Sequence, residues 1–326
     1  MAEVLPITLR TIPVVRRVEY LDAFLDGVSK GWEKKELEAA IGERKKNFEL
    51  EKNLALGRGK PYQKKITEAV RLQEYCLRLG KDLGFIEKIG LKIRLLDKGR
   101  TYIEADEKSR MRILGEAYSE AYPHLSAIVL ALNRLGKDEA VLPLQNKPPI
   151  RPEITKIGIN IDQVSFDTVR DVGTRLGLIN WYVTGSGADR RQYVYSTCAV
   201  TENSPQGDYL FRLNHRGRWL FATQNRVKRN EFKAALWDSY ITLANGVPGS
   251  PIFYSLVREQ VCAALRIRDD QFDSETMNMV DWDESLHVIW SEGVLPYQQD
   301  SASMLKSLPP KNEWGRYVVY LKIVRK

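Results

Sequence analysis

The sequence contains little cysteine and little histidine, with three of each in 326 residues. The cysteines lie far apart and form no C-x-x-C pair, which argues against a disulfide framework and against a zinc finger. No histidine lies near a cysteine or another histidine in the sequence, so we expect no metal site and no cofactor. The residues concerned are Cys76, Cys198, Cys262, His124, His215 and His287.

Long apolar runs are also missing. No stretch approaches the ~18 apolar residues that cross a bilayer, and the first 17 residues lack the compact apolar segment of a signal peptide. We therefore expect a cytoplasmic protein with no membrane partner. Hydrophobic residues make up 43% of the chain and charged residues 28%, as in ordinary globular proteins. A chain of 326 residues predicts two or three domains, because one domain usually takes roughly 100 to 200 residues.

Sequence signatures of catalysis are absent as well. The chain has neither Gly-x-Ser-x-Gly nor a nucleotide-binding fingerprint. A nuclease would need clustered carboxylates and usually a lysine to hold a metal and activate water. Residues 269–284 supply the acids but no lysine. We assign no catalytic residue, and a divergent metal-dependent nuclease stays open as an alternative.

Positive charge is abundant, and it is unevenly distributed. The net charge is +8, and residues 1–110 hold 24 Lys and Arg against 18 Asp and Glu. Six of the eight excess charges therefore lie in the first third of the chain. A polyanion would dock most readily there.

The first third is organised around residues 57–99. A basic loop ends in Pro61, which suits the first turn of a helix. Apolar residues then recur at helical spacing over residues 63–78, with a charged stripe opposite. Two short β-type runs, 85–89 and 91–96, follow on either side of Gly90. Residues 15–28 and 32–41 predict two earlier helices, and residues 43–52 either extend the second helix or form a turn.

This order returns later in the chain. Residues 162–176 predict a helix, followed by strands 178–183 and 193–200. Both helices are expected to end on Arg-Leu-Gly, with Gly80 and Gly177 as left-handed helix stops. A fainter third copy covers residues 250–324, with helices over 253–265 and 269–279 and strands over 285–290 and 316–324.

On these stretches the sequence resembles the winged helix-turn-helix superfamily. The resemblance implies an α+β, predominantly helical fold of two or three tandem winged helix-turn-helix units, each with three helices and a β-hairpin wing. It also implies double-stranded DNA as partner, with the third helix of a unit in the major groove and the wing along the backbone or minor groove. The expected units are residues 1–104, 105–204 and 205–326, the last with a basic connector.

Candidate DNA contacts come from three parts of the chain. The first unit offers phosphate contacts and base contacts, the second unit offers its hairpin loop, and the connector offers exposed cations. The phosphate candidates are Arg58, Lys60, Lys64, Lys65, Lys88, Lys92 and Arg94. The base-edge candidates are Tyr62, Gln63, Thr67 and Arg71. The loop candidates are Ser186, Arg190, Arg191 and Gln192, and the connector candidates are Arg216, Arg218, Lys228 and Arg229.

The second and third units carry acids where a DNA-reading helix would lie. Asp162, Asp167 and Asp171 would repel phosphate, and residues 269–284 hold seven further carboxylates. The acidic third unit is therefore either a solvated surface or a face for a protein partner or a second copy of the chain. We favour a non-enzymatic DNA-binding protein, with a subunit of a protein assembly as the alternative from another class.

Overall fold

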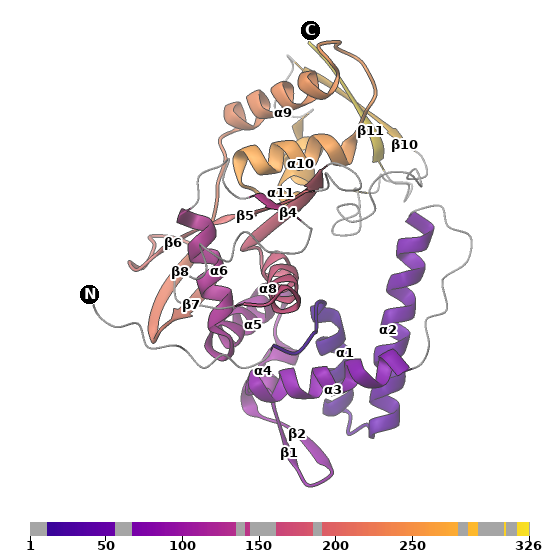
Figure 1. The fold of residues 1–326 in the computed structure, drawn as a ribbon, viewed down its shortest axis with the longest axis vertical. Helices are drawn as coiled ribbons and strands as arrows, with labels where there is room; N and C mark the ends of the chain where they lie inside the picture. Colours follow the sequence, from indigo (N-terminus) through magenta and orange to yellow (C-terminus); the bar gives the residue numbers. More distant parts are fainter. Residues whose placement is uncertain are drawn as a thin grey trace.

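The computed structural model describes residues 12–55, 67–134, 141–143, 161–184, 191–279, 286–292, 310 and 318–325. Helices predominate in these ranges and are joined by small antiparallel sheets (Figure 1), which confirms the α+β, mainly helical class. None of the helices found in the described ranges is long and apolar enough to span a membrane.

The first unit consists of three helices followed by a hairpin. The helices are α1 (Val18–Ser29), α2 (Lys34–Ala55) and α3 (Thr67–Asp82), and the strands are β1 (Ile86–Ile89) and β2 (Lys92–Leu95). The predicted apolar face of α1 is buried, since its residues at helical spacing turn to one side. The two segments expected at 32–41 and 43–52 form the single helix α2. Figure 1 shows the β1–β2 hairpin projecting beyond the helices at the bottom of the view.

The expected end of α3 is wrong. The helix continues through Gly80 to Asp82, and the left-handed residue is Gly84, with φ 70°. Gly80 lies inside the helix, where a Cβ would come within 3.1 Å of the Ile86 side chain. Glycine therefore allows Ile86 to pack closely on the helix. The corresponding expectation for Gly177 is confirmed, because its φ is 77°.

The repeat is longer than the sequence indicated, and its register is different. In the first unit Phe85 N donates to Gly80 O at 2.9 Å, and in the second Leu178 N donates to Gly173 O at 2.9 Å. Gly173 also packs under an isoleucine, since a Cβ there would lie 2.7 Å from Ile179 Cδ1. Gly80 thus corresponds to Gly173, and the helix stop Gly84 corresponds to Gly177.

The strand that closes each hairpin matches too. Leu96 N donates to Phe85 O at 2.9 Å, and Thr197 N donates to Leu178 O at 3.0 Å. The second unit uses α8 (Gln163–Arg175), β4 (Ile179–Thr184) and β5 (Arg191–Ser196) for this arrangement. The same backbone hydrogen bonds therefore join helix and hairpin in both units.

Two sheets share one strand order. A short strand, β3 (Val141–Pro143), pairs with β5, giving the order β3-β5-β4. In the third unit the short strand β9 (Ile252–Phe253) pairs with β11 (Val318–Arg325), which pairs with β10 (Leu286–Glu292). In each sheet an early short strand thus joins the last strand of a later pair. The helices of the third unit are α9 (Arg229–Leu243), α10 (Tyr254–Leu265) and α11 (Asp269–Met277).

A further sheet covers helix α5 (Glu107–Ala121). It contains β6 (Cys198–Thr201), β7 (Phe211–His215) and β8 (Arg218–Gln224), in the order β6-β8-β7. The strand expected at 193–200 is therefore divided at Thr197 between two sheets, and the predicted connector contains two strands. A Cβ at Gly115 would lie 2.5 Å from the Phe211 ring. Glycine at this position therefore allows α5 to pack closely against β7.

Two buried clusters form the core. The larger cluster is continuous from the first unit through α4 (Asp97–Glu104), α5 and α6 (Pro123–Arg134) to β8. The smaller cluster joins the third unit to Tyr195 of β5. The first and second units thus share one core, and the third unit is attached to it through the β4–β5 hairpin.

Candidate nucleic-acid interface

Helix α3 exposes a face that is mostly basic. Arg71, Glu74 and Lys81 are exposed, and Arg78 is half exposed with its Nε 3.8 Å from Asp82 Oδ2, one helical turn away. The opposite face is buried on Cys76 and other apolar residues, as the sequence predicted. Over its whole length the helix carries three cations and three acids, Glu68, Glu74 and Asp82, so a positive excess arises only together with the hairpin that follows it.

The hairpin beside α3 adds three exposed cations. Lys88 and Lys92 are exposed, and so is Arg94, which pairs with Glu87 directly opposite on β1. Helix α3 leads into β1 through the turn at Gly84, so the hairpin cations follow the C-terminal end of the helix. Of the predicted contacts, Arg71 is exposed on α3, and Lys88, Lys92 and Arg94 are exposed on the hairpin.

Arg78 and Lys81 were not among the predicted contacts. Lys81 was missed because the expected helix ended before it. Gly84 marks the true end, since it and not Gly80 adopts the left-handed conformation. One more turn of helix then places Lys81 on the exposed stripe.

Several predicted contacts lie outside the described residues. They are Arg58, Lys60, Tyr62, Gln63, Lys64, Lys65, Ser186 and Arg190. Thr67 is the first residue of α3, and Arg191 and Gln192 lie in β5. Thr67 thus begins the helix whose exposed face carries Arg71.

The acids of α8 are engaged in ion pairs. Arg170 Nη2 lies 2.6 Å from Asp171 Oδ1, and Arg170 Nη1 lies 3.1 Å from Asp167 Oδ1. Arg16 lies in the segment before α1. Its Nη2 is 3.7 Å from Asp167 Oδ2, and its Nε is 4.0 Å from Asp171 Oδ2. Burial raises the pKa of Asp171, and the neighbouring Arg170 opposes that rise. The two carboxylates of α8 therefore pair with Arg170 of the same helix and with Arg16 of the first unit.

Asp162, the third acid assigned to this helix, is its N-cap. Its carboxylate accepts from Ser165 N at 2.8 Å and from Ser165 Oγ at 3.0 Å. The hydrogen bond from the Ser165 backbone lowers the pKa of Asp162. This carboxylate thus begins the helix and satisfies one of its free N–H groups.

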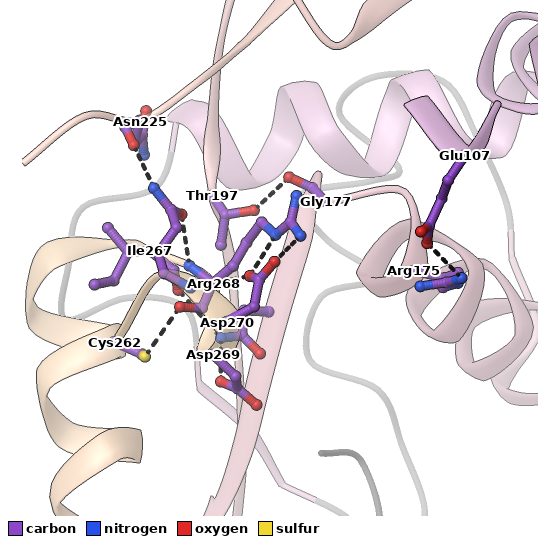
Figure 2. Close-up of polar contacts among 12 residues, drawn as sticks. Glu107, Arg175, Gly177, Thr197, Asn225, Cys262, Ile267, Arg268, Asp269 and Asp270 are labelled. Atoms are coloured by element: carbon purple, nitrogen blue, oxygen red, sulfur yellow. Dashed lines mark hydrogen bonds and ion pairs between the residues drawn. The ribbon is translucent and has the colours of Figure 1, made fainter. Parts of the chain in front are cut away.

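The acids of α11 are engaged inside the molecule as well. Asp269 is only 8% exposed, and its Oδ1 accepts from Asn180 Nδ2 of β4 at 2.8 Å. Figure 2 shows this carboxylate beside Asp270, which instead pairs with Arg268, its Oδ1 accepting from Arg268 Nε at 2.8 Å. The expectation of a solvated or partner-facing acidic surface is therefore wrong for Asp269.

Asp273 belongs to the same network, with its side chain 20% exposed. It accepts from Tyr254 Oη at 2.9 Å and pairs with Arg258 Nη1 at 3.2 Å. Arg258 is 2% exposed, and burial opposes its charge, but Asp269 and Asp273 outweigh burial and hold its pKa above the usual range. Burial likewise raises the pKa of Asp273, against the effect of Arg258. A buried arginine needs these carboxylates as partners, so Asp273 is not available for docking either.

The predicted connector contacts lie on other elements. Arg216, with φ 54°, forms the β7–β8 turn, and Arg218 on β8 lies 3.8 Å from Glu202. Lys228 occupies the N-cap position of α9 without a side-chain capping bond, and Arg229 begins the helix. In Figure 1 the β7–β8 hairpin and α9 both lie well away from the β1–β2 hairpin. The structure does not bring these four residues together with the basic face of the first unit.

A cleft of about 530 Å³ lies where the three units meet. Arg16, Arg170, Arg175 and Arg268 line it together with Asp171, Asp269 and Asp270. The charges that line the cleft are thus of both signs. Figure 2 shows that one of its cations, Arg175, pairs with Glu107, with Arg175 Nη2 3.1 Å from Glu107 Oε1. The cleft does not present the one-signed surface that a polyanion would favour. In the described part of the chain, no group of three His, Cys, Asp or Glu residues is placed to hold a metal ion.

Comparisons with known proteins give little guidance. No protein-family model and no curated protein matches the chain. One solved structure, described as the structure of restriction endonuclease FokI, is similar with 13% sequence identity and a TM-score of 0.29. The match covers 97% of this chain and 64% of the FokI chain. A TM-score this low carries no argument about fold or function, so a function for this chain has to follow from its own geometry.

Proposed function

We propose that this protein is a non-enzymatic double-stranded DNA-binding protein built from three tandem winged-helix units. Helix α3 enters the major groove, and the β1–β2 hairpin is the wing that follows the backbone beside it. The element order of the first unit, and the strand order shared by the β3-β5-β4 and β9-β11-β10 sheets, support the winged-helix assignment.

The observation that carries the DNA assignment is the difference between three equivalent helices. Helices α3, α8 and α11 each precede a strand pair in their unit. On α8 and α11, four acids have partners within the molecule: Asp167 and Asp171 pair with Arg16, Asp269 accepts from Asn180, and Asp273 pairs with Arg258. Helix α3 and the β1–β2 hairpin after it together carry six cations against four acids, an excess that suits a phosphate backbone.

Residues 57–65 belong to the same proposal. They precede α3 in sequence and contain Arg58, Lys60, Lys64 and Lys65. A basic segment before the groove-entering helix would add phosphate contacts, and Gln63 and Arg71 suit adenine and guanine edges. The alternative of an assembly subunit has less support, because it relied on an acidic docking face and Asp269 and Asp273 lie inside the molecule.

The test is binding of the purified chain to a labelled random-sequence duplex, titrated from low to physiological salt. The double variant Arg71→Ala/Lys81→Ala is compared with Lys34→Ala/Lys108→Ala. The control removes two exposed lysines that already lie beside carboxylates, at 3.8 Å from Glu38 and 2.9 Å from Asp208.

We expect salt-dependent binding that weakens at least tenfold in the α3 variant, because each cation removed takes away a phosphate or base contact. The control should bind within about twofold of the unaltered chain. Equal loss in both variants would move the binding surface away from α3, and no binding by the unaltered chain would overturn the proposal. Cleavage of the duplex in Mg²⁺ or Mn²⁺ would replace the non-enzymatic assignment with that of a nuclease.

A further inference from the structure

The tip of the β1–β2 hairpin has an unusual composition. Ile89 pairs with Lys92, so Gly90 and Leu91 form a two-residue turn. Gly90 has φ 59°, as the first position of a type II′ turn requires. A turn this short fixes the residue that follows the glycine, and that residue is Leu91.

Leu91 is 96% exposed and Ile89 is 61% exposed. They are the two most exposed large hydrophobic side chains among the described residues. Gly, Asn, Asp and Ser are the residues that usually occupy such turns. A leucine at the tip contributes nothing to the core, so the folding of the hairpin does not explain it.

The charged residues near the tip of the hairpin indicate an anionic partner. Lys88 and Lys92 flank the turn and are exposed, and the acid nearest to them, Glu87, is paired with Arg94. The tip therefore combines an apolar end with two cations at its base. The tip belongs to the first unit and follows α3, the helix that we assign to the major groove.

We infer that Leu91 is an apolar wedge that enters the minor groove of a duplex and opens a base step, bending the DNA. Lys88 and Lys92 bind the phosphates on either side of the groove, and Ile89 packs beside the opened step. Minor-groove proteins that insert leucine or isoleucine in this way kink the duplex by roughly 20° to 90°. This inference rests on the proposed DNA binding and adds a deformation that binding alone does not require.

A wedge also affects the choice of site. Pyrimidine–purine steps such as TA and CA unstack most easily, so opening them costs least. The wing should therefore favour duplexes with such a step at its position, although it makes no hydrogen bond to a base.

The experiment measures bending and binding in the same samples. Duplexes of about 30 base pairs carry a fluorescent donor and acceptor at their ends, with or without a central TA step. Energy transfer reports the bend, and anisotropy reports binding. The variants are Leu91→Ala, Leu91→Phe and, as a matched control, Val247→Ala, which truncates another apolar side chain that is 57% exposed.

We expect the full-length chain to bend the duplex, and to bend the TA duplex more. Leu91→Ala should still bind with an unchanged salt dependence but should lose most of the bend, whereas Leu91→Phe and Val247→Ala should keep it. Because Leu91 makes no core contact, thermal unfolding should be the same in all variants.

Two results would overturn the inference in different ways. Binding without a bend, or with the same bend in Leu91→Ala, would refute the wedge and leave DNA binding intact. No binding to any duplex would refute both. In that case, retention on vesicles of phosphatidylcholine and phosphatidylserine that depends on Leu91 would reassign the tip to a lipid surface.

Discussion

Asn180 and Asp269 lie 89 positions apart in the sequence and are joined by a buried hydrogen bond of 2.8 Å. The same amide group also donates to Ile267 O at 3.1 Å. The hydrogen bond to Asp269 joins the first residue of α11 to strand β4. It accounts for an acidic residue that the sequence alone would place on a surface.

Replacing Asp269 should therefore destabilise the fold, whereas replacing its neighbour should not. Asp269→Ala leaves the Asn180 amide and the buried Arg258 with one partner fewer, and should cost about 3 kcal/mol in the free energy of unfolding. Asp270→Ala removes an exposed carboxylate and should cost less than about 1 kcal/mol. Urea unfolding of both variants measures the difference, and similar losses would contradict the internal role of Asp269.

The wing should contribute to the salt dependence of DNA binding. Lys88→Ala/Lys92→Ala should lower the slope of log K against log salt by about two units, roughly one for each phosphate that is no longer neutralised by a lysine. Filter binding at a series of salt concentrations measures this slope. An unchanged slope in the variant would show that the wing makes no phosphate contact.

Gly99 should be the least replaceable of the described glycines in the first unit. A Cβ there would lie 2.2 Å from Phe85 O, a backbone atom that cannot move aside easily. Gly99→Ala should therefore destabilise the chain by more than about 2 kcal/mol. Gly207→Ala is the control, because a Cβ at that position meets nothing within 4 Å. Thermal unfolding of the two variants tests the contrast, which equal melting temperatures would contradict.

His124 should make the fold acid-sensitive. Burial lowers its pKa to about 4, and among the described residues its Nδ1 has no hydrogen-bond partner. The unfolded chain takes up a proton near pH 6.5, so protonation favours unfolding. The stability that His124 contributes is complete above about pH 7 and is lost as the pH falls toward 4. The full loss is about 3 kcal/mol.

The corresponding measurement is urea unfolding between pH 7.5 and 4 for the unaltered chain and for His124→Leu. The variant should lose less stability over this range. Equal losses in the two proteins would assign the acid sensitivity to other groups.

The sequence predicted the helices with a clear apolar stripe. In α1, Val18, Leu21 and Phe24 all lie in the core as expected, because spacing alone determines which side of a helix is apolar. The exact end of α3 was not predictable in this way. Gly80 and Gly84 are both plausible helix stops in sequence, and only the packing of Ile86 against Gly80 decides between them.

The candidate site was predicted less completely. Exposed cations on the first unit could be anticipated from charge and periodicity, as Arg71 and Lys92 illustrate. The roles of Asp269 and Asp273 could not, because a run of acids looks the same in sequence whether it faces water or a buried arginine. That distinction depends on Arg258 and Asn180, which lie on other elements.

The unequal use of α3, α8 and α11 has a consequence for the DNA. A dimer with two equivalent reading helices matches a palindromic site by its two-fold symmetry. Here the repeats lie within one chain, and two of the three helices direct their charged side chains toward neighbouring units. In the proposed complex one chain presents a single reading surface, so a site bound by one copy is expected to be asymmetric and to be bound in one direction.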